Sequence, residues 1–125
     1  MMIHVIEDDS IYGEFIKRIL EQEPEYTVKV FSSGEEWLET SAGLPDAIIS
    51  DYYLSGMTGL EFFERIKENM GPDNKFILIS SIDDSNTLLD FIRKGVRNYV
   101  IKNDDMIDSI RSILAGNEDA AYHFG

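Results

Sequence analysis

Five short apolar runs alternate with five helix-like segments along this chain, and no other feature restricts the fold as strongly. The apolar runs cover residues 2–6, 27–31, 46–50, 75–80 and 97–101. The helix-like segments cover residues 10–21, a short stretch after 33, 58–66, 84–94 and 104–115. Continuous apolar strands joined by helical crossovers predict a parallel sheet with helices on both faces. Because five units are too few for an eight-stranded barrel, the pattern indicates an open, doubly wound α/β sheet.

Local signals predict where the helices begin and end. Ser33 with Glu36, and Thr58 with Glu61, each have the spacing of a capping box, in which each side chain accepts a hydrogen bond from the other residue's backbone N–H. Gly95 follows the last residue of a helix-like segment, where the left-handed conformation of a helix stop favours glycine. These signals agree with the alternation of strands and helices.

Apolar side chains at helical spacing predict which helix faces are buried. From the first helix we expect four to face inward: Ile11, Phe15, Ile19 and Leu20. Phe62 and Phe63 are adjacent, and neighbouring residues on a helix point about 100° apart. We therefore expect one of these two rings to be exposed.

Composition excludes several classes of function. The chain has 125 residues and no cysteine, which rules out disulfides, thiolate metal sites and cysteine nucleophiles. Acidic residues number 24 against 11 basic ones, a net charge of −13, and such a surface repels nucleic-acid backbones. No apolar stretch is long enough to span a bilayer, and no signal peptide is visible. We expect a cytoplasmic protein that contacts neither membranes nor nucleic acid directly.

Polar residues collect where the predicted strands end. They are Glu7, Asp8 and Asp9 after the first strand, Asp51 after the third, Ser80 and Ser81 at the fourth, and Lys102 after the fifth. Open parallel sheets place their sites at the carboxyl ends of the strands. Carboxylates without histidine or thiolate suit Mg²⁺ or Mn²⁺, and a lysine with a hydroxyl suits a phosphoryl group. A carboxylate beside a metal can form an aspartyl-phosphate.

Simpler interpretations of these residues remain open at this point. Asp8, Asp9 and Ser10 could serve only to cap the first helix, and Asp51 could be a turn residue before Ser55. The agreement of four strand ends favours a site. Neither common glycine-rich phosphate loop is present, so nucleotide binding is not indicated.

Four segments in order carry a family resemblance: VIEDD at 5–9, IISDYYLSGMTGLEFFERIK at 48–67, ILISS at 77–81 and GVRNYVIK at 95–102. Along most of its length the chain resembles the receiver domain of two-component response regulators. The resemblance implies a flavodoxin-like (βα)₅ fold with strand order 2-1-3-4-5. It also implies a receiver domain over residues 1–118, followed by a C-terminal tail over 119–125.

The resemblance implies a role for each site residue. Asp51 would accept a phosphoryl group from the phosphohistidine of a sensor histidine kinase or phosphotransfer protein. Asp8 and Asp51 would bind Mg²⁺, with Glu7 holding the metal through water and the backbone carbonyl of Tyr53 as a further ligand. Asp9 matches no such role, and we interpret it as the helix cap.

The resemblance also implies which residues would respond to phosphorylation. Lys102 would pair with the phosphoryl oxygens, and Ser80 would move to hydrogen-bond them. Tyr99 would turn inward when Ser80 moves, which would alter the face formed by the fourth helix, fifth strand and fifth helix. A downstream effector would bind this face.

The chain departs from the family pattern in three places. Asn103 follows Lys102 where proline, often after a cis bond, is usual, and a cis bond before Asn would cost about 2.5–4 kcal/mol, so we expect trans. Ser55 replaces a common proline. Tyr53 is bulky at a position that, with Ile82, would flank the path of a hydrolytic water, which implies slow loss of phosphate.

Three functions compete. The first is a phosphorylation switch, which is not an enzyme beyond its own phosphorylation and dephosphorylation. The alternative is a Mg²⁺-dependent phosphohydrolase with an aspartyl intermediate, which usually needs a general acid where Tyr53 stands. The third is a degenerate interaction module, and the intact set of Asp8, Asp51, Ser80 and Lys102 argues against it.

Overall fold

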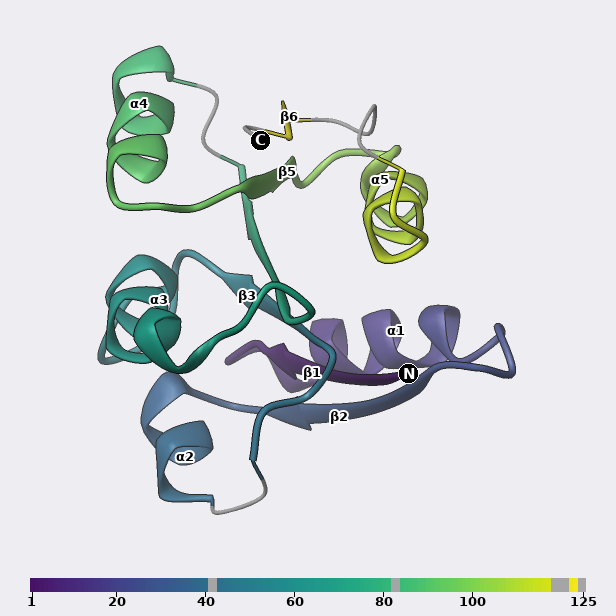
Figure 1. The fold of residues 1–125 in the computed structure, drawn as a ribbon. Helices are drawn as coiled ribbons and strands as arrows, with labels where there is room; N and C mark the ends of the chain where they lie inside the picture. The colour runs from purple at the N-terminus through teal and green to yellow at the C-terminus, as the bar shows by residue number, and fades with distance from the viewer. Residues whose placement is uncertain (41–42, 82–83, 118–121, 124–125) are drawn as a thin grey trace.

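A computed structural model describes residues 1–40, 43–81, 84–117 and 122–123 (Figure 1). Strands and helices alternate from the start of the chain. The strands are β1 (Met2–Ile6), β2 (Thr27–Phe31), β3 (Ala47–Asp51), β4 (Lys75–Ser80), β5 (Asn98–Ile101) and β6 (Tyr122–His123). The helices are α1 (Ser10–Leu20), α2 (Gly34–Glu39), α3 (Gly59–Ile66), the 3₁₀ turn η1 (Lys67–Asn69), α4 (Ser85–Arg93) and α5 (Met106–Leu114).

The strands form one sheet in the order β2-β1-β3-β4-β5-β6. The first five are parallel, which confirms the predicted doubly wound α/β fold and its strand order 2-1-3-4-5. β6 was not predicted. It pairs antiparallel with β5, with Tyr99 opposite Tyr122, and it comes from the segment expected to be a plain tail. A two-residue strand carries no periodic apolar signal, so the sequence could not indicate it.

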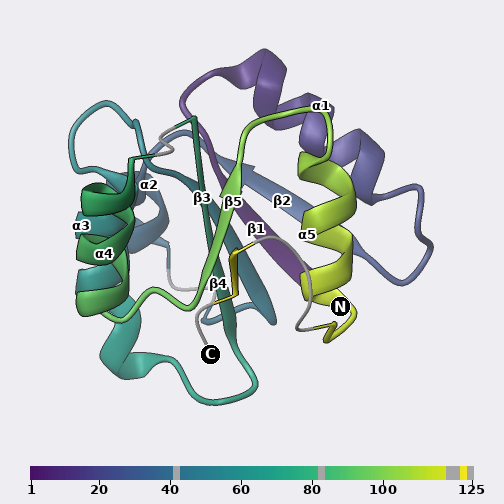
Figure 2. The same ribbon diagram turned by 90° about the horizontal axis from the view of Figure 1, so that it is seen from above.

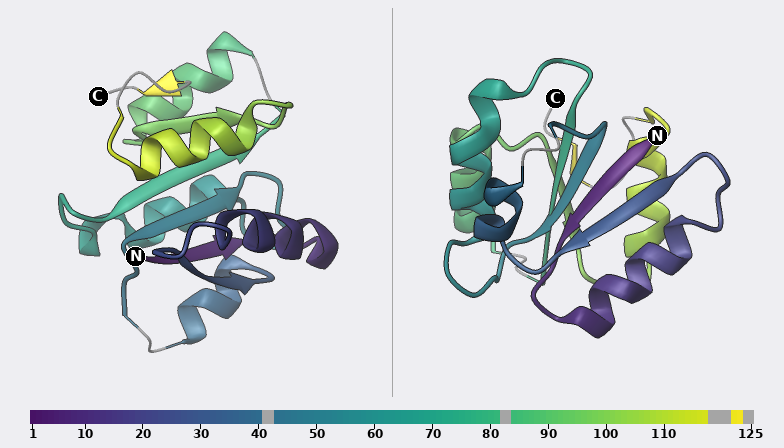
Figure 3. Two further views of the ribbon diagram at one scale, coloured as in Figure 1. Left: turned by 90° about the vertical axis from the view of Figure 1, so that its right-hand side faces the viewer. Right: turned by 90° about the horizontal axis from the view of Figure 1, so that it is seen from below.

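Helices cover both faces of the sheet, as Figures 2 and 3 show. α1 and α5 pack on one face, over a cluster that includes Val5 and Ile49 from the strands. α2, α3 and α4 pack on the other, over a cluster that includes Ile48 and Leu78. Successive strand residues point to opposite faces, so strands covered on both sides are apolar throughout. This burial explains the continuous apolar runs.

The predicted inner face of α1 is wrong in part: Leu20 is buried as expected and Ile19 is half-buried, but Ile11 and Phe15 face outward. Ile11 is 82% exposed and Phe15 is 47% exposed, whereas Gly13, Ile16 and Leu20 are buried. A Cβ at Gly13 would lie 2.8 Å from a methyl group of Val30 on β2, so the helix approaches the sheet through its glycine. The pattern of large apolar residues cannot reveal such a contact.

The expectation that Phe62 or Phe63 is exposed is also wrong. Phe62 is fully buried and Phe63 is 7% exposed. The ring of Phe63 packs 4.8 Å from that of Phe76 on β4, while Phe62 lies 5.4 Å from Trp37 of α2. α3 is covered by the sheet on one side and by α2 on the next, so two adjacent faces of the helix are buried.

The predicted helix signals are largely confirmed. Thr58 and Glu61 form the complete capping box at the start of α3, and Gly95 ends α4 with a φ of +99°. At α2 only half of the box forms: the Ser33 hydroxyl accepts from the Glu36 N–H, but the Glu36 carboxylate accepts from Ser32 instead. Within the described ranges, no helix has the length and apolar character needed to cross a membrane.

Gly59, the first residue of α3, packs directly against the end of β3. A Cβ at this position would lie 2.2 Å from the backbone oxygen of Asp51 and 2.9 Å from a methyl group of Leu78. We predict that Gly59→Ala lowers the free energy of unfolding in urea by about 1–3 kcal/mol, because the backbone of β3 must shift. Gly71→Ala is the matched control, since the nearest atom to its Cβ would be 3.7 Å away. Equal stability of the two variants would contradict this packing.

Candidate functional site

The carboxyl ends of the parallel strands meet at one edge of the sheet. Asp51 is the last residue of β3, one residue further along than the predicted strand end, and β3 lies between β1 and β4. Glu7 follows β1 and Lys102 follows β5. Figure 2 shows the chain leaving β1 and β5 at the same end of the sheet, where α1 and α5 begin.

Lys102 joins the ends of three strands. Its Nζ lies 2.5 Å from Asp51 Oδ2 and 3.5 Å from Glu7 Oε1. Both carboxylates are buried, with Asp51 4% and Glu7 3% exposed. Burial acts to lower the pKa of the Lys102 ammonium, but its hydrogen bond with Asp51 and the two negative charges outweigh this and raise it. The structure thus holds Lys102 charged between the two acids.

Of the three residues, Glu7 has the carboxylate whose negative charge is least favourable. Burial, and then the charge of Asp51, raise the pKa of the Glu7 carboxyl to about 7, while Lys102 opposes the rise. The Glu7 carboxylate also accepts a 3.4 Å hydrogen bond from the Asp9 N–H. One ammonium therefore faces two carboxylates, which leaves this edge short of positive charge.

Asp8 interacts with the side chain of Glu7, but its main partner is Ser55. Its exposed carboxylate accepts hydrogen bonds from the backbone N–H and the hydroxyl of Ser55, both at 3.0 Å. Burial acts to raise the pKa of the Asp8 carboxyl, but the hydrogen bonds, chiefly those from Ser55, together outweigh it and lower the pKa. In the part of the chain that the structure describes, no three carboxylate or histidine side chains form a group that could hold a metal ion. The predicted gathering of carboxylates is therefore incomplete in this arrangement.

Two expectations near the site are confirmed. Asp9 caps α1, and its carboxylate accepts hydrogen bonds from the N–H groups of Ile11 and Tyr12. No cis peptide bond occurs among the described residues, so the bond between Lys102 and Asn103 is trans.

Tyr12 is a site residue that the sequence analysis missed. The Nζ of Lys102 lies 4.7 Å from the centre of the Tyr12 ring, within the range of a cation–π contact. The Tyr12 hydroxyl donates a 3.2 Å hydrogen bond to the sulfur of Met106, which ties α1 to α5. The available signal was its position, in the first turn of the helix that follows Glu7 and Asp8.

Ser80 and Tyr99 lie close behind the acidic edge. Ser80 is the last residue of β4 and is fully buried, and its carbonyl accepts a 2.9 Å hydrogen bond from the Lys102 backbone N–H. Tyr99 is also fully buried, with its ring 5.3 Å from that of Phe91 on α4. Tyr99 therefore already points inward here, and its movement with Ser80 stays a prediction.

The backbone of Tyr53 contacts Asp51, and its side chain lies at the surface. Its N–H donates a 3.2 Å hydrogen bond to Asp51 Oδ1, and its side chain is 58% exposed beside the ring of Tyr52. Ile82, expected to flank the same path, lies outside the described residues. The predicted metal contact through the Tyr53 carbonyl and the predicted slow loss of phosphate remain predictions.

Comparison with known proteins identifies the family. The sequence model of the response regulator receiver domain matches residues 3–113. This chain belongs to the response regulator receiver domain family. Among curated relatives, this receiver domain is 27% identical over 124 residues to the transcriptional regulatory protein DegU of Brevibacillus brevis, covering 93% of the chain and 51% of DegU. It is 24% identical to the nitrate/nitrite response regulator NarL of Escherichia coli K12, covering 91% of the chain and 55% of NarL.

Solved structures agree with this assignment. The response regulator DrrB of Thermotoga maritima is 25% identical, with a TM-score of 0.81 over 99% of this chain and 57% of DrrB. The BeF₃-activated receiver domain of DrrB has a TM-score of 0.76 at 25% identity, covering 91% of this chain and 97% of that one. The receiver domain spans about half of the length of the curated relatives that it matches.

Receiver domains of response regulators interact with kinases and effectors, and they generally bind Mg²⁺ for phosphorylation. The donors available here suit that ion, because Glu7, Asp8, Asp51 and the Tyr53 carbonyl offer only oxygen. Asp8 is the donor that this structure directs elsewhere, toward Ser55.

The contact between Ser55 and Asp8 competes with a metal for the same carboxylate. We predict that Ser55→Ala raises Mg²⁺ affinity severalfold in calorimetric titration. Without the Ser55 hydroxyl, the Asp8 carboxylate has one hydrogen bond fewer to break before it can bind the metal. The control is a double-mutant cycle with Asp8→Asn, in which Ser55→Ala should change nothing further. Unchanged affinity in the single variant would show that Ser55 does not hold Asp8 back.

Proposed function

We propose that this receiver domain is a phosphorylation switch that accepts a phosphoryl group on Asp51 from a histidine-kinase or phosphotransfer phosphohistidine. The observation that carries the proposal is the contact of Asp51 with Lys102 at the carboxyl end of β3, beside Glu7. A carboxylate with one ammonium aimed at it, at the site edge of a doubly wound sheet, suits phosphoryl transfer.

In the transfer, a carboxylate oxygen of Asp51 attacks phosphorus. The bond between phosphorus and the donor's imidazole nitrogen breaks, its electron pair stays on that nitrogen, and an aspartyl-phosphate forms. Lys102 pairs with the phosphoryl oxygens, since its Nζ already contacts Asp51 Oδ2. Transfer of this kind depends mainly on positioning and on neutralising charge.

The metal would be held by Asp8, Asp51 and the Tyr53 carbonyl, with Glu7 acting through water. When bound, Mg²⁺ supplies positive charge to the phosphoryl oxygens. The shortage of positive charge around Glu7 and Asp51 supports a cation at this edge. Mn²⁺ has the same ligand preference and would replace it.

The switch would run through Ser80 and Tyr99 to the face formed by α4, β5 and α5, where a downstream effector would bind. The Lys102 N–H already bonds the Ser80 carbonyl, so the ends of β4 and β5 are linked at the site. β6 pairs with β5 at Asn98 and Tyr99, so it lies along the central strand of this face. An effector that reaches β5 would have to displace or include β6.

The remaining expectations belong to the same proposal. The domain acts as a switch and not as a turnover enzyme, in the cytoplasm, without contacting nucleic acid directly. The phosphohydrolase alternative needs a general acid two residues after Asp51. Tyr53 holds that position with its side chain largely in solvent, which supports the switch.

The direct test is mass spectrometry after incubation with a small phosphodonor and Mg²⁺. We expect the gain of one phosphoryl group, mapped to Asp51, and no gain in Asp51→Asn. That substitution is nearly isosteric, and a matched melting temperature would show that the fold is kept. Full labelling of Asp51→Asn would reject the assignment.

Tyr12 should position Lys102 for the transfer. We predict that Tyr12→Leu slows labelling about fivefold, the loss of about 1 kcal/mol expected for a partly buried cation–π contact. Tyr12→Phe keeps the ring and loses only the hydrogen bond to Met106, so it should label nearly as fast as wild type. If both variants are equally slow, the hydroxyl and not the ring is what matters.

A further inference from the structure

A basic groove lies at the end of the sheet opposite Asp51. It has a volume of about 770 Å³ and runs between η1, the amino end of β4 and the turn from α4 to β5. Its cations, which define the basic groove, are Lys67, Lys75, Arg93, Lys94 and Arg97. They are five of the chain's eleven basic residues, and Glu68 is the single acidic residue among those described as lining it. In a chain of net charge −13, this concentration of positive charge needs an explanation.

Most of these cations are not neutralised by the protein. Within the described ranges, only Lys94 forms ion pairs, with Glu64 and Asp90 at 3.7 Å each. Lys67 and Lys75 each donate to a backbone carbonyl, of Lys94 and Ile113, near the ends of α4 and α5. Lysines favour helix carboxyl ends, so part of their placement is structural, although each ammonium keeps two further donors.

Arg97 has no such role, whereas Arg93 is the last residue of α4, where a cation also suits the carboxyl end of the helix. Both are exposed, and neither has an ion-pair or hydrogen-bond partner in the described parts of the chain. Their charge is available to a molecule from outside.

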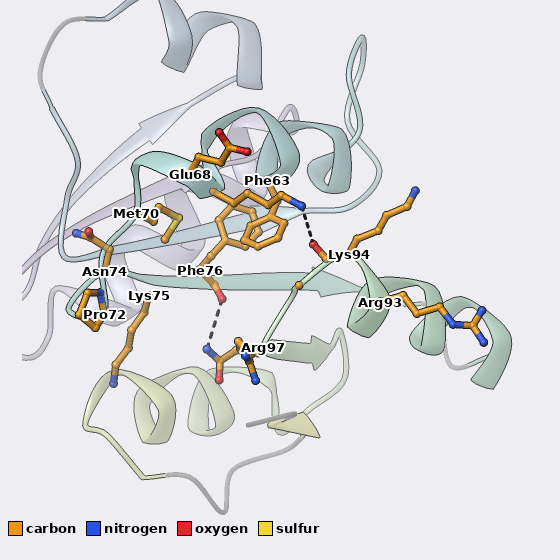
Figure 4. A pocket seen from close by; sticks show the side chains of 13 residues that line it. Phe63, Glu68, Met70, Pro72, Asn74, Lys75, Phe76, Arg93, Lys94 and Arg97 are labelled. Atoms are coloured by element: carbon orange, nitrogen blue, oxygen red, sulfur yellow. Dashed lines mark hydrogen bonds between the residues drawn. The ribbon is translucent and has the colours of Figure 1, made fainter.

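Apolar groups accompany the charge. Four apolar residues also line the groove: Phe63, Met70, Pro72 and Phe76. Met70 is partly exposed and Pro72 is exposed. Figure 4 shows Lys75 and Arg93 extending in different directions from the central pair of rings, so the cations do not converge on one point. A single phosphate could not contact them together, whereas an extended chain with separated negative charges could.

We propose that the basic groove binds an extended acidic polypeptide segment of a partner protein, with an apolar side chain over Met70 and Pro72. Charge complementarity favours this occupant. A nucleic acid would carry regular charge far beyond the groove, where it would meet the acidic surface. Binding of this segment does not depend on the proposed phosphorylation of Asp51.

The test uses fluorescence anisotropy with a fluorescein-labelled twelve-residue peptide of glutamate with two central leucines. We expect binding at low salt that is lost in high salt, because exposed charges are screened. Arg93→Glu with Arg97→Glu should weaken it about tenfold or more, since two attractive charges become repulsive. Both side chains are exposed and form no ion pair or hydrogen bond within the described ranges, so the variant should melt like wild type.

The matched control reverses two cations outside the groove, Arg18→Glu with Lys29→Glu, and should bind the peptide nearly as well as wild type. Asp51→Asn should also bind it unchanged. Equal loss in the groove variant and the control, or equal binding of the peptide with glutamine in place of glutamate, would overturn the proposal. So would the absence of binding at low salt, or equal or tighter binding of a twelve-nucleotide single-stranded DNA.

Discussion

Lys102 lies between two buried carboxylates, and the acidic edge of the sheet depends on this contact. Glu7 follows β1 and Asp51 ends β3, and because these strands are parallel neighbours the two charges lie close together. Burying one carboxylate costs several kcal/mol unless a partner compensates, and here one ammonium serves two. The pKa of the Glu7 carboxyl stays raised because Lys102 compensates only part of the cost of burial and of the nearby Asp51 charge. The topology thus gathers more negative than positive charge at this edge of the sheet.

Much of this could be predicted from the sequence, because the signals involved are local. Strands buried on both faces are apolar throughout, and residues just after them share an edge of the sheet. The placement of Asp51, Glu7 and Lys102 at one edge of the sheet follows from those two rules. The trans bond after Lys102 follows from the cost of a cis bond before asparagine.

The parts that could not be predicted depend on contacts between distant segments. α1 turns its glycine to the sheet because Val30 leaves no room for a Cβ, which no count of apolar residues detects. Phe62 is buried because Trp37 covers it from another helix. Asp8 bonds Ser55, 47 residues away, through an N–H that a proline at that position would not have. Tyr12 meets Lys102 only because α1 and α5 lie side by side.

The pairing of β6 with β5 has a consequence for how copies of this domain behave in a crowded solution. A sheet that ended at β5 would offer a row of backbone donors and acceptors on which another chain could assemble. β6 occupies that row opposite Asn98 and Tyr99, and two residues are too few to serve as a template in turn. The pairing therefore hinders edge-to-edge assembly along the first half of β5, which continues two residues further, to Ile101.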